Sequence, residues 1–144
     1  MFWAAALWLA SAVLIVAPVQ AAELTVLSGN GAKAAVTELA ARFERATGHT
    51  VSIHFEVNPA VRKRIEGGEA FDVAVLNPPV LDALIAQGKV AGSTRAVFGR
   101  SGIGMAVRAG VASNAREPDA ARARVQYLAA PANVPVLGAF GVEP

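Results

Sequence analysis

The chain of 144 residues contains no cysteine and two histidines, and 6% of its residues are aromatic. The absence of cysteine excludes disulfide bonds and thiolate metal sites. His49 and His54 do not form an H-x-x-H or H-E-x-x-H pattern, so we expect no metal site and no cofactor. An excess of one charge is also lacking, because 13 Lys and Arg stand against 11 Asp and Glu. This balance gives no electrostatic case for nucleic-acid binding.

The first part of the chain, from Phe2 to Val19, is almost wholly apolar. Val19-Gln20-Ala21 follows it with small residues at the positions that signal peptidase prefers, so we predict a signal peptide cleaved after Ala21. The apolar run has no Lys or Arg before it, and its length approaches that of a membrane span, so a retained N-terminal anchor is the alternative. In both cases we expect the remainder outside the cytoplasm, in the periplasm.

The segment that follows has the pattern of a strand, a tight turn and a helix. Leu24–Leu27 form a short apolar run, Ser28-Gly29-Asn30-Gly31 interrupts it, and Ala32–Thr47 has apolar residues at helical spacing. The first backbone N–H groups of such a helix are unpaired, and Ser28 and Asn30 could add side-chain donors. The turn therefore indicates a pocket for an anion or polar ligand. The alternative is an ordinary connection in which Gly and Asn only supply positive φ.

Two further strand and helix pairs follow, and together they predict the fold class. We expect strands over 51–57, at the sheet edge, and 71–76, with helices over 60–66 and 80–87. Three such units predict a single three-layer α/β lobe with a mostly parallel sheet and helices on both faces. Ligands bind beyond the carboxyl ends of parallel strands. Ser28, Asn30 and Gly31 of the first turn and Asn77 of the third are therefore expected at one edge.

The last third of the chain is less regular. A longer β pattern runs from Ala96 to Val107, and Gly102 and Gly104 within it predict a bulge or a close backbone approach. Ser101 is a third polar group that could face the same edge. Asp119–Leu128 is predicted to be a helix that packs back on the lobe. The expected organisation is a signal peptide (1–21), a first α/β lobe (22–110), a linker (111–118) and a C-terminal helical segment (119–144).

Several segments resemble the periplasmic substrate-binding proteins of ABC importers, of the molybdate-binding type II family. The resemblance rests on residues 24–32, 41–44, 71–75, 84–90, 100–110, 120–131 and 141–144. It implies half of a two-lobed type II periplasmic-binding-protein fold, with segment 111–118 in place of the second lobe. It also implies a non-enzymatic solute-binding component of an ABC importer, whose partners are molybdate, a similar oxyanion or another small polar solute, and an ABC permease in the inner membrane.

The resemblance also assigns the site residues. Ser28 matches the first-turn serine of the family, and Ser101 is a counterpart of another ligand contact. The family has an oxyanion-binding serine after the third strand, whereas Leu76-Asn77-Pro78-Pro79 stands there in this chain. Helix N-terminal N–H groups, serine hydroxyls and the Asn77 amide are the expected donors. With one lobe, binding is expected to be weak or lost.

The sequence is also compatible with three other interpretations. Gly29-Asn30-Gly31-Ala32-Lys33-Ala34 fits G-x-G-x-x-A, which indicates a dinucleotide-binding module, although an export signal argues against a nicotinamide cofactor. A hydrolase is disfavoured because Gly99-Arg100-Ser101-Gly102 does not fit G-x-S-x-G and neither histidine is placed as a base. The last alternative is a secreted α/β fragment that binds no ligand.

Overall fold

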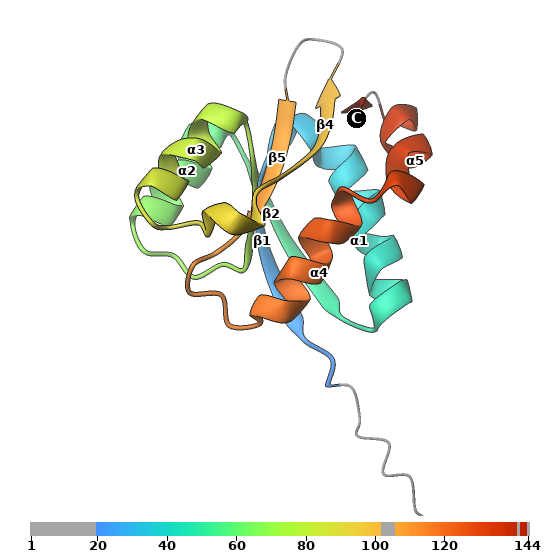
Figure 1. The fold of residues 1–144 in the computed structure, drawn as a ribbon, viewed down its shortest axis with the longest axis horizontal. Coiled ribbons are helices and arrows are strands. Elements are labelled where there is room, and N and C mark those ends of the chain that lie inside the picture. The colour runs from blue at the N-terminus through green and yellow to red at the C-terminus, as the bar shows by residue number, and fades with distance from the viewer. Residues whose placement is uncertain (1–19, 102–105, 141, 144) are drawn as a thin grey trace, which may run out of the picture.

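The computed structural model of the chain describes residues 20–101, 106–140 and 142–143 (Figure 1). They form a six-stranded sheet of order β2-β1-β3-β5-β4-β6. The apolar run of residues 2–19 and the glycines at 102 and 104, which were expected to form a signal segment and a bulge, lie outside the described residues. Over the described ranges, no helix is long and apolar enough to cross a membrane.

The first half of the sheet is parallel, as predicted. β1 (Glu23–Gly29) lies between β2 (Thr50–Glu56) and β3 (Val73–Leu76) and pairs in parallel with both. β1 and β3 are rich in apolar residues because both of their faces are covered by helices. β2 is an edge strand, and none of its residues is fully buried.

The second half of the sheet is antiparallel. β5 (Ala106–Val111) pairs with β3 and with β4 (Ala96–Ser101), and β4 also pairs with β6 (Val142–Glu143). The expectation of one strand from 96 to 107 was therefore wrong, because the chain turns back between β4 and β5. An alternating pattern continues through such a reversal, so periodicity alone does not reveal it. A register shift of the bulge type lies between Val97 and Gly99.

The helices form a layer on each side of the sheet (Figure 1). The short 3-10 turn η1 (Asn30–Ala32) leads into α1 (Lys33–Thr47), which ends at Gly48 with a φ of 74°. The other elements are α2 (Asn58–Glu66), α3 (Pro78–Ala86), η2 (Gly92–Thr94), α4 (Pro118–Leu128), η3 (Pro131–Asn133) and α5 (Val134–Ala139). α1, α4 and α5 contribute to the core on one face, and α2 and α3 contribute to the core on the other.

The C-terminal helix α4 is part of the core of the lobe. Its residues Ala121, Val125 and Leu128 belong to the same buried cluster as Leu39 and Phe43 of α1. Each buried apolar side chain of this size contributes roughly 1.5–3 kcal/mol, so α4 adds substantially to the stability of the sheet and of α1.

A buried arginine lies at the contact between α4 and α1. Arg124 is 0% exposed, and its guanidinium donates to Leu39 O at 3.2 Å and to Val36 O at 3.4 Å. The ring of Phe43 lies 5.4 Å from the guanidinium carbon. Burial lowers the pKa of Arg124 to about 10, and the charge of Glu44 offsets only part of that effect. The helical pattern had not distinguished this arginine from its exposed neighbours.

Candidate functional site

The carboxyl ends of β1, β2 and β3 meet at one edge of the sheet, and η1, α2 and α3 begin there. We call five residues at this edge the rim, because each offers a polar side chain or an exposed backbone there. They are Ser28, Asn30, Gly31, Asn58 and Asn77. None of η1, α1, α2 and α3 has a side chain hydrogen-bonded as an N-terminal cap. Uncapped helix starts favour anions through their dipoles and their unpaired N–H groups.

Asn58 joins the three parts of the rim. Its Oδ1 accepts a hydrogen bond from the backbone N–H of Asn77 at 3.1 Å. It also lies against the end of β1, because a Cβ added to Gly29 would lie 2.7 Å from the same oxygen. The turns after the first and third strands are therefore linked by a residue from the second. Sequence reasoning missed this role, although Asn58-Pro59 repeats the Asn-Pro pattern of Asn77-Pro78.

The first turn offers donors at Asn30 and Gly31, which are both exposed. Ser28 lies deeper, because it is 0% exposed and its hydroxyl donates to Gly29 O at 3.0 Å. Contact between the Ser28 hydroxyl and a ligand therefore requires the side chain to rotate away from this carbonyl. The exposed part of the turn is the peptide backbone and side chain of Asn30–Gly31.

The third turn differs from the expected helix N-terminus. Pro78 and Pro79 have no N–H group, and the N–H groups of Val80 and Leu81 donate to Asn77 O at 3.1 and 3.0 Å. The Asn77 N–H is itself bonded to Asn58. The expectation that backbone N–H groups at the start of α3 hold a ligand is therefore corrected. The donor that this turn offers is the side-chain amide of Asn77.

Ser101 is not brought together with the other predicted residues. β4 runs in the same direction as β3, so its end points to the same edge, but β5 lies between the two strands. Val97 and Leu76 are both paired with Arg108, so Val97 is the residue of β4 that is level with the end of β3. Ser101 lies further along β4, next to β6.

Charged side chains near the rim are engaged in other contacts. Glu56, in register with Gly29, accepts from Arg64 at 2.6 Å. Arg64 also binds Glu69, and this hydrogen bond holds the pKa of the Glu69 carboxyl below its usual range. Lys33, the first residue of α1, places its Nζ 5.5 Å from the centroid of the Phe55 ring. The five rim residues themselves are neutral, and Lys33 is a cation close to the first turn.

The two histidines have surroundings that suit structural roles. His49 Nδ1 accepts from the Ala22 N–H at 3.0 Å, and its ring lies 5.9 Å from that of Phe43. His54 is exposed on the edge strand β2. No group of three or more metal-ligating side chains occurs in the part of the chain that the structure describes.

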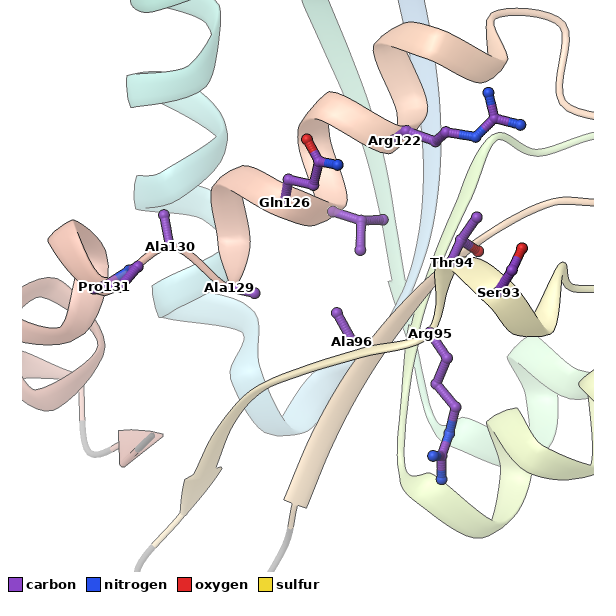
Figure 2. A pocket seen from close by; sticks show the side chains of 10 residues that line it. Ser93, Thr94, Arg95, Ala96, Arg122, Gln126, Ala129, Ala130 and Pro131 are labelled. Carbon is purple, nitrogen blue, oxygen red and sulfur yellow. The ribbon is translucent and has the colours of Figure 1, made fainter.

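Two hollows of the surface lie away from the rim. One of about 600 Å³ lies between α4 and the segment from η2 to the start of β4, as Figure 2 shows. Another of about 460 Å³ lies at the opposite edge, beside Asp72. The Asp72 carboxylate accepts hydrogen bonds from the backbone N–H groups of Thr25 at 2.8 Å and Arg116 at 3.1 Å. It therefore links β1 to the segment before α4.

Comparisons of the sequence point to one family and to one partial relative. The profile of the family described as bacterial extracellular solute-binding protein matches residues 24–124. A protein named aconitate isomerase, from a Pseudomonas species, is 39% identical over 111 residues, which is 73% of this chain. The chain spans 42% of the length of that relative.

Two solved structures share the fold. The substrate-binding domain of a putative molybdenum ABC transporter from Clostridium difficile matches with a TM-score of 0.77 at 8% identity, over 85% of this chain and 99% of that one. The periplasmic molybdate-binding protein of Azotobacter vinelandii matches with a TM-score of 0.76 at 12% identity, over 84% and 99%. At these identities the likeness concerns the fold, and it agrees with the α/β lobe predicted from the sequence.

Proposed function

Because this chain belongs to the bacterial extracellular solute-binding protein family, we propose that it is a solute-binding lobe of an ABC importer and holds a small oxyanion at the rim. The observation that carries the proposal is the contact of Asn58 with both Gly29 and Asn77, which brings the first and third turns to one place. The carboxyl edge of the parallel strands is also where α/β sheets bind ligands.

The proposed ligand contacts are neutral donors. The backbone at Asn30 and Gly31 and the side-chain amide of Asn77 supply them, and the Ser28 hydroxyl joins if it rotates outward. A hydrogen bond to a charged oxygen contributes about 1.5–3 kcal/mol. A few such bonds, on a surface open to water, correspond to a dissociation constant on the order of millimolar. Segment 111–118 leads from β5 to α4, and in our proposal it replaces a second lobe that would enclose the ligand.

The test is a titration followed by NMR. Isotope-labelled protein comprising residues 22–144 is titrated with molybdate, sulfate and phosphate. We expect the amides of residues 30, 31 and 77 to shift first. Asn77→Ala should abolish these shifts, whereas Asn114→Ala, an exposed asparagine at the opposite edge, should leave them unchanged. Shifts centred on Arg62–Arg64 would show non-specific attraction to charge and would contradict the proposal.

A polycarboxylate is the second candidate ligand, because a relative that is 39% identical is named aconitate isomerase. Isomerisation of such a substrate requires a base that removes a proton. The rim consists of serine, asparagine and glycine, which do not titrate near neutral pH. We therefore propose binding without turnover. Adding trans-aconitate in the same titration, with the solution assayed for the cis isomer, tests both parts, and isomer formation would contradict the binding-only proposal.

The proposed location is the periplasm, reached through a signal peptide. Mass spectrometry of exported protein should find Ala22 at the mature N-terminus. An intact apolar N-terminus in the membrane fraction would instead show a retained anchor. Cross-linking in membranes of the source cell would test an ABC permease as the partner. If Asn77→Ala abolishes the cross-link, the permease recognises the solute-bound state.

A further inference from the structure

Lys33, the first residue of α1, is an exposed cation beside the first turn of the rim. Among the described residues no carboxylate forms an ion pair with it, whereas arginines such as Arg42 and Arg64 are bound to glutamates. Its Nζ lies instead 5.5 Å from the centroid of the Phe55 ring. Cation–π contacts are weak where water reaches them, so the ammonium can exchange the ring for a charged partner.

The ring beneath Lys33 lies on the same face of the sheet as Ser28. Leu24 and Val26 of β1 and Phe55 of β2 belong to the cluster that α1 covers. Because alternate residues of a strand point to the same face, Ser28 shares this face, and it is in register with Phe55. Neighbouring strands lie about 4.8 Å apart, and helical side chains lean toward the N-terminus of their helix. The ammonium of Lys33 is therefore next to the end of β1.

The acidic side chain at this edge is on the other face of the sheet. Glu56 follows Phe55 on β2, so its side chain points away from α1. Its carboxylate pairs with Arg64 of α2 at 2.6 Å. Glu56 is therefore directed away from Lys33 and has a partner of its own. The exposed turn Asn30–Gly31 leads directly into α1, so it lies on the side of Lys33.

We propose that Lys33 is a specificity-determining residue of the rim. Its ammonium turns from the Phe55 ring to the bound anion, and its charge makes the rim select small dianions over monoanions. This inference rests on the proposed function. It adds one cation to the neutral donors of Asn30, Gly31 and Asn77.

The preference for dianions follows from the charges. Neutral N–H donors can bind the oxygens of any oxyanion, whatever its net charge. The Coulomb energy is proportional to the product of the charges, so one ammonium attracts a dianion about twice as strongly as a monoanion at the same distance. The flexible four-carbon stem of Lys33 lets the ammonium follow the ligand.

The test compares sulfate, a dianion, with nitrate, a monoanion, in the NMR titration of residues 22–144 in dilute buffer, since salt screens exposed charges. We expect Lys33→Met to raise the dissociation constant for sulfate at least about fivefold and that for nitrate by less. Lys33→Arg, which keeps the charge, should retain most of the affinity. Lys63→Met removes an exposed lysine on α2 and should leave both constants unchanged.

The outcomes separate this inference from the proposed function. If residues 30, 31 and 77 shift equally in wild type and Lys33→Met, with the same constants, the role of Lys33 is overturned while the site stands. If these residues shift with no anion, the proposed function fails and this inference fails with it. An equal effect of Lys63→Met would show general attraction to charge and would also overturn the role of Lys33.

The ring of Phe55 gives a second measurement on the same samples. If the ammonium turns from the ring to the anion, sulfate should shift the ring protons of Phe55 in the wild-type protein. In Lys33→Met the ring has no cation to lose, so these protons should stay in place. Equal ring shifts in the two proteins would overturn the proposal. Because Lys33 is exposed, its substitution should leave the fold intact.

Discussion

The backbone N–H of Asn77 donates to Oδ1 of Asn58 over 3.1 Å, and this bond joins the starts of α3 and α2. Both residues precede a proline, which has no N–H and cannot take part in capping. The side chain of Asn58 thereby satisfies the donor that precedes α3 and at the same time packs against Gly29. The geometry of the rim depends on this one amide.

Gly29→Ala should disturb that amide. The new Cβ would lie 2.7 Å from Asn58 Oδ1, so the side chain must move and the Asn77 N–H loses its partner. An unsatisfied donor costs about 1–3 kcal/mol, and we expect a loss of about that size in urea unfolding. Gly138→Ala, where nothing lies within 4 Å of the new Cβ, is the control. In an Asn58→Ala background Gly29→Ala should cost almost nothing, and equal costs in both backgrounds would refute the contact.

Arg124→Met should stabilise the protein. Burial lowers the pKa of Arg124 from its ordinary value to about 10, so the charged form is less favourable in the folded state than in the unfolded state. A shift of that size corresponds to about 3 kcal/mol, and buried charges can often be replaced by apolar residues with a gain. We expect about 1–3 kcal/mol more stability in urea unfolding, after the loss of two long hydrogen bonds. Arg122→Met, on the exposed face of α4, should change stability by less than about 0.5 kcal/mol. A clear loss in Arg124→Met would mean that those hydrogen bonds outweigh the desolvation.

The stability of the protein should fall in acid partly through Glu69. Its hydrogen bond from Arg64 lowers the pKa of the carboxyl in the folded state below the ordinary value of 4.5. The ionised Glu69 carboxylate therefore stabilises the folded state fully above pH 4.5, and this stabilisation is lost as the pH falls through the lower pKa of the folded state. Urea unfolding between neutral and acidic pH should show that the difference between wild type and Glu69→Gln shrinks below pH 4.5. In an Arg64→Met background the difference should be small at every pH, and a persistent difference would assign the effect to another partner.

Leu128→Ala should show that α4 belongs to the lobe. Leu128 is 0% exposed in the cluster shared with α1, and removing a buried leucine typically costs about 2–5 kcal/mol. Gln126→Ala is the matched control, since this residue is exposed and lies two positions before Leu128 on the same helix. Thermal unfolding of the two variants makes the comparison. A midpoint for Leu128→Ala equal to that of the control would mean that the helix is only loosely attached.

The order and positions of most elements could be predicted from the sequence. The run Leu24–Leu27, the helical spacing after Ala32 and the cap at Gly48 indicate β1 and α1, because apolar period and glycine reflect local backbone geometry. The parallel pairing of the first three strands follows from the alternation of strands and helices. That pattern also placed Ser28–Gly31 and Asn77 at the same edge.

The contacts that give the rim its chemistry were decided by the tertiary structure. Whether a side chain is free depends on neighbours that lie far away in the sequence, so no local pattern showed that Ser28 is buried or that Asn58 reaches Asn77. The reversal between β4 and β5 is also invisible to periodicity, because a β pattern continues through it. This reversal places β5 between β3 and β4 and so separates Ser101 from the rim. Arg124 follows the same rule. Helical spacing set its place on α4, but the packing of α4 on α1 set its burial. The apolar surface buried between these helices stabilises the fold by more than the desolvation of one charge costs.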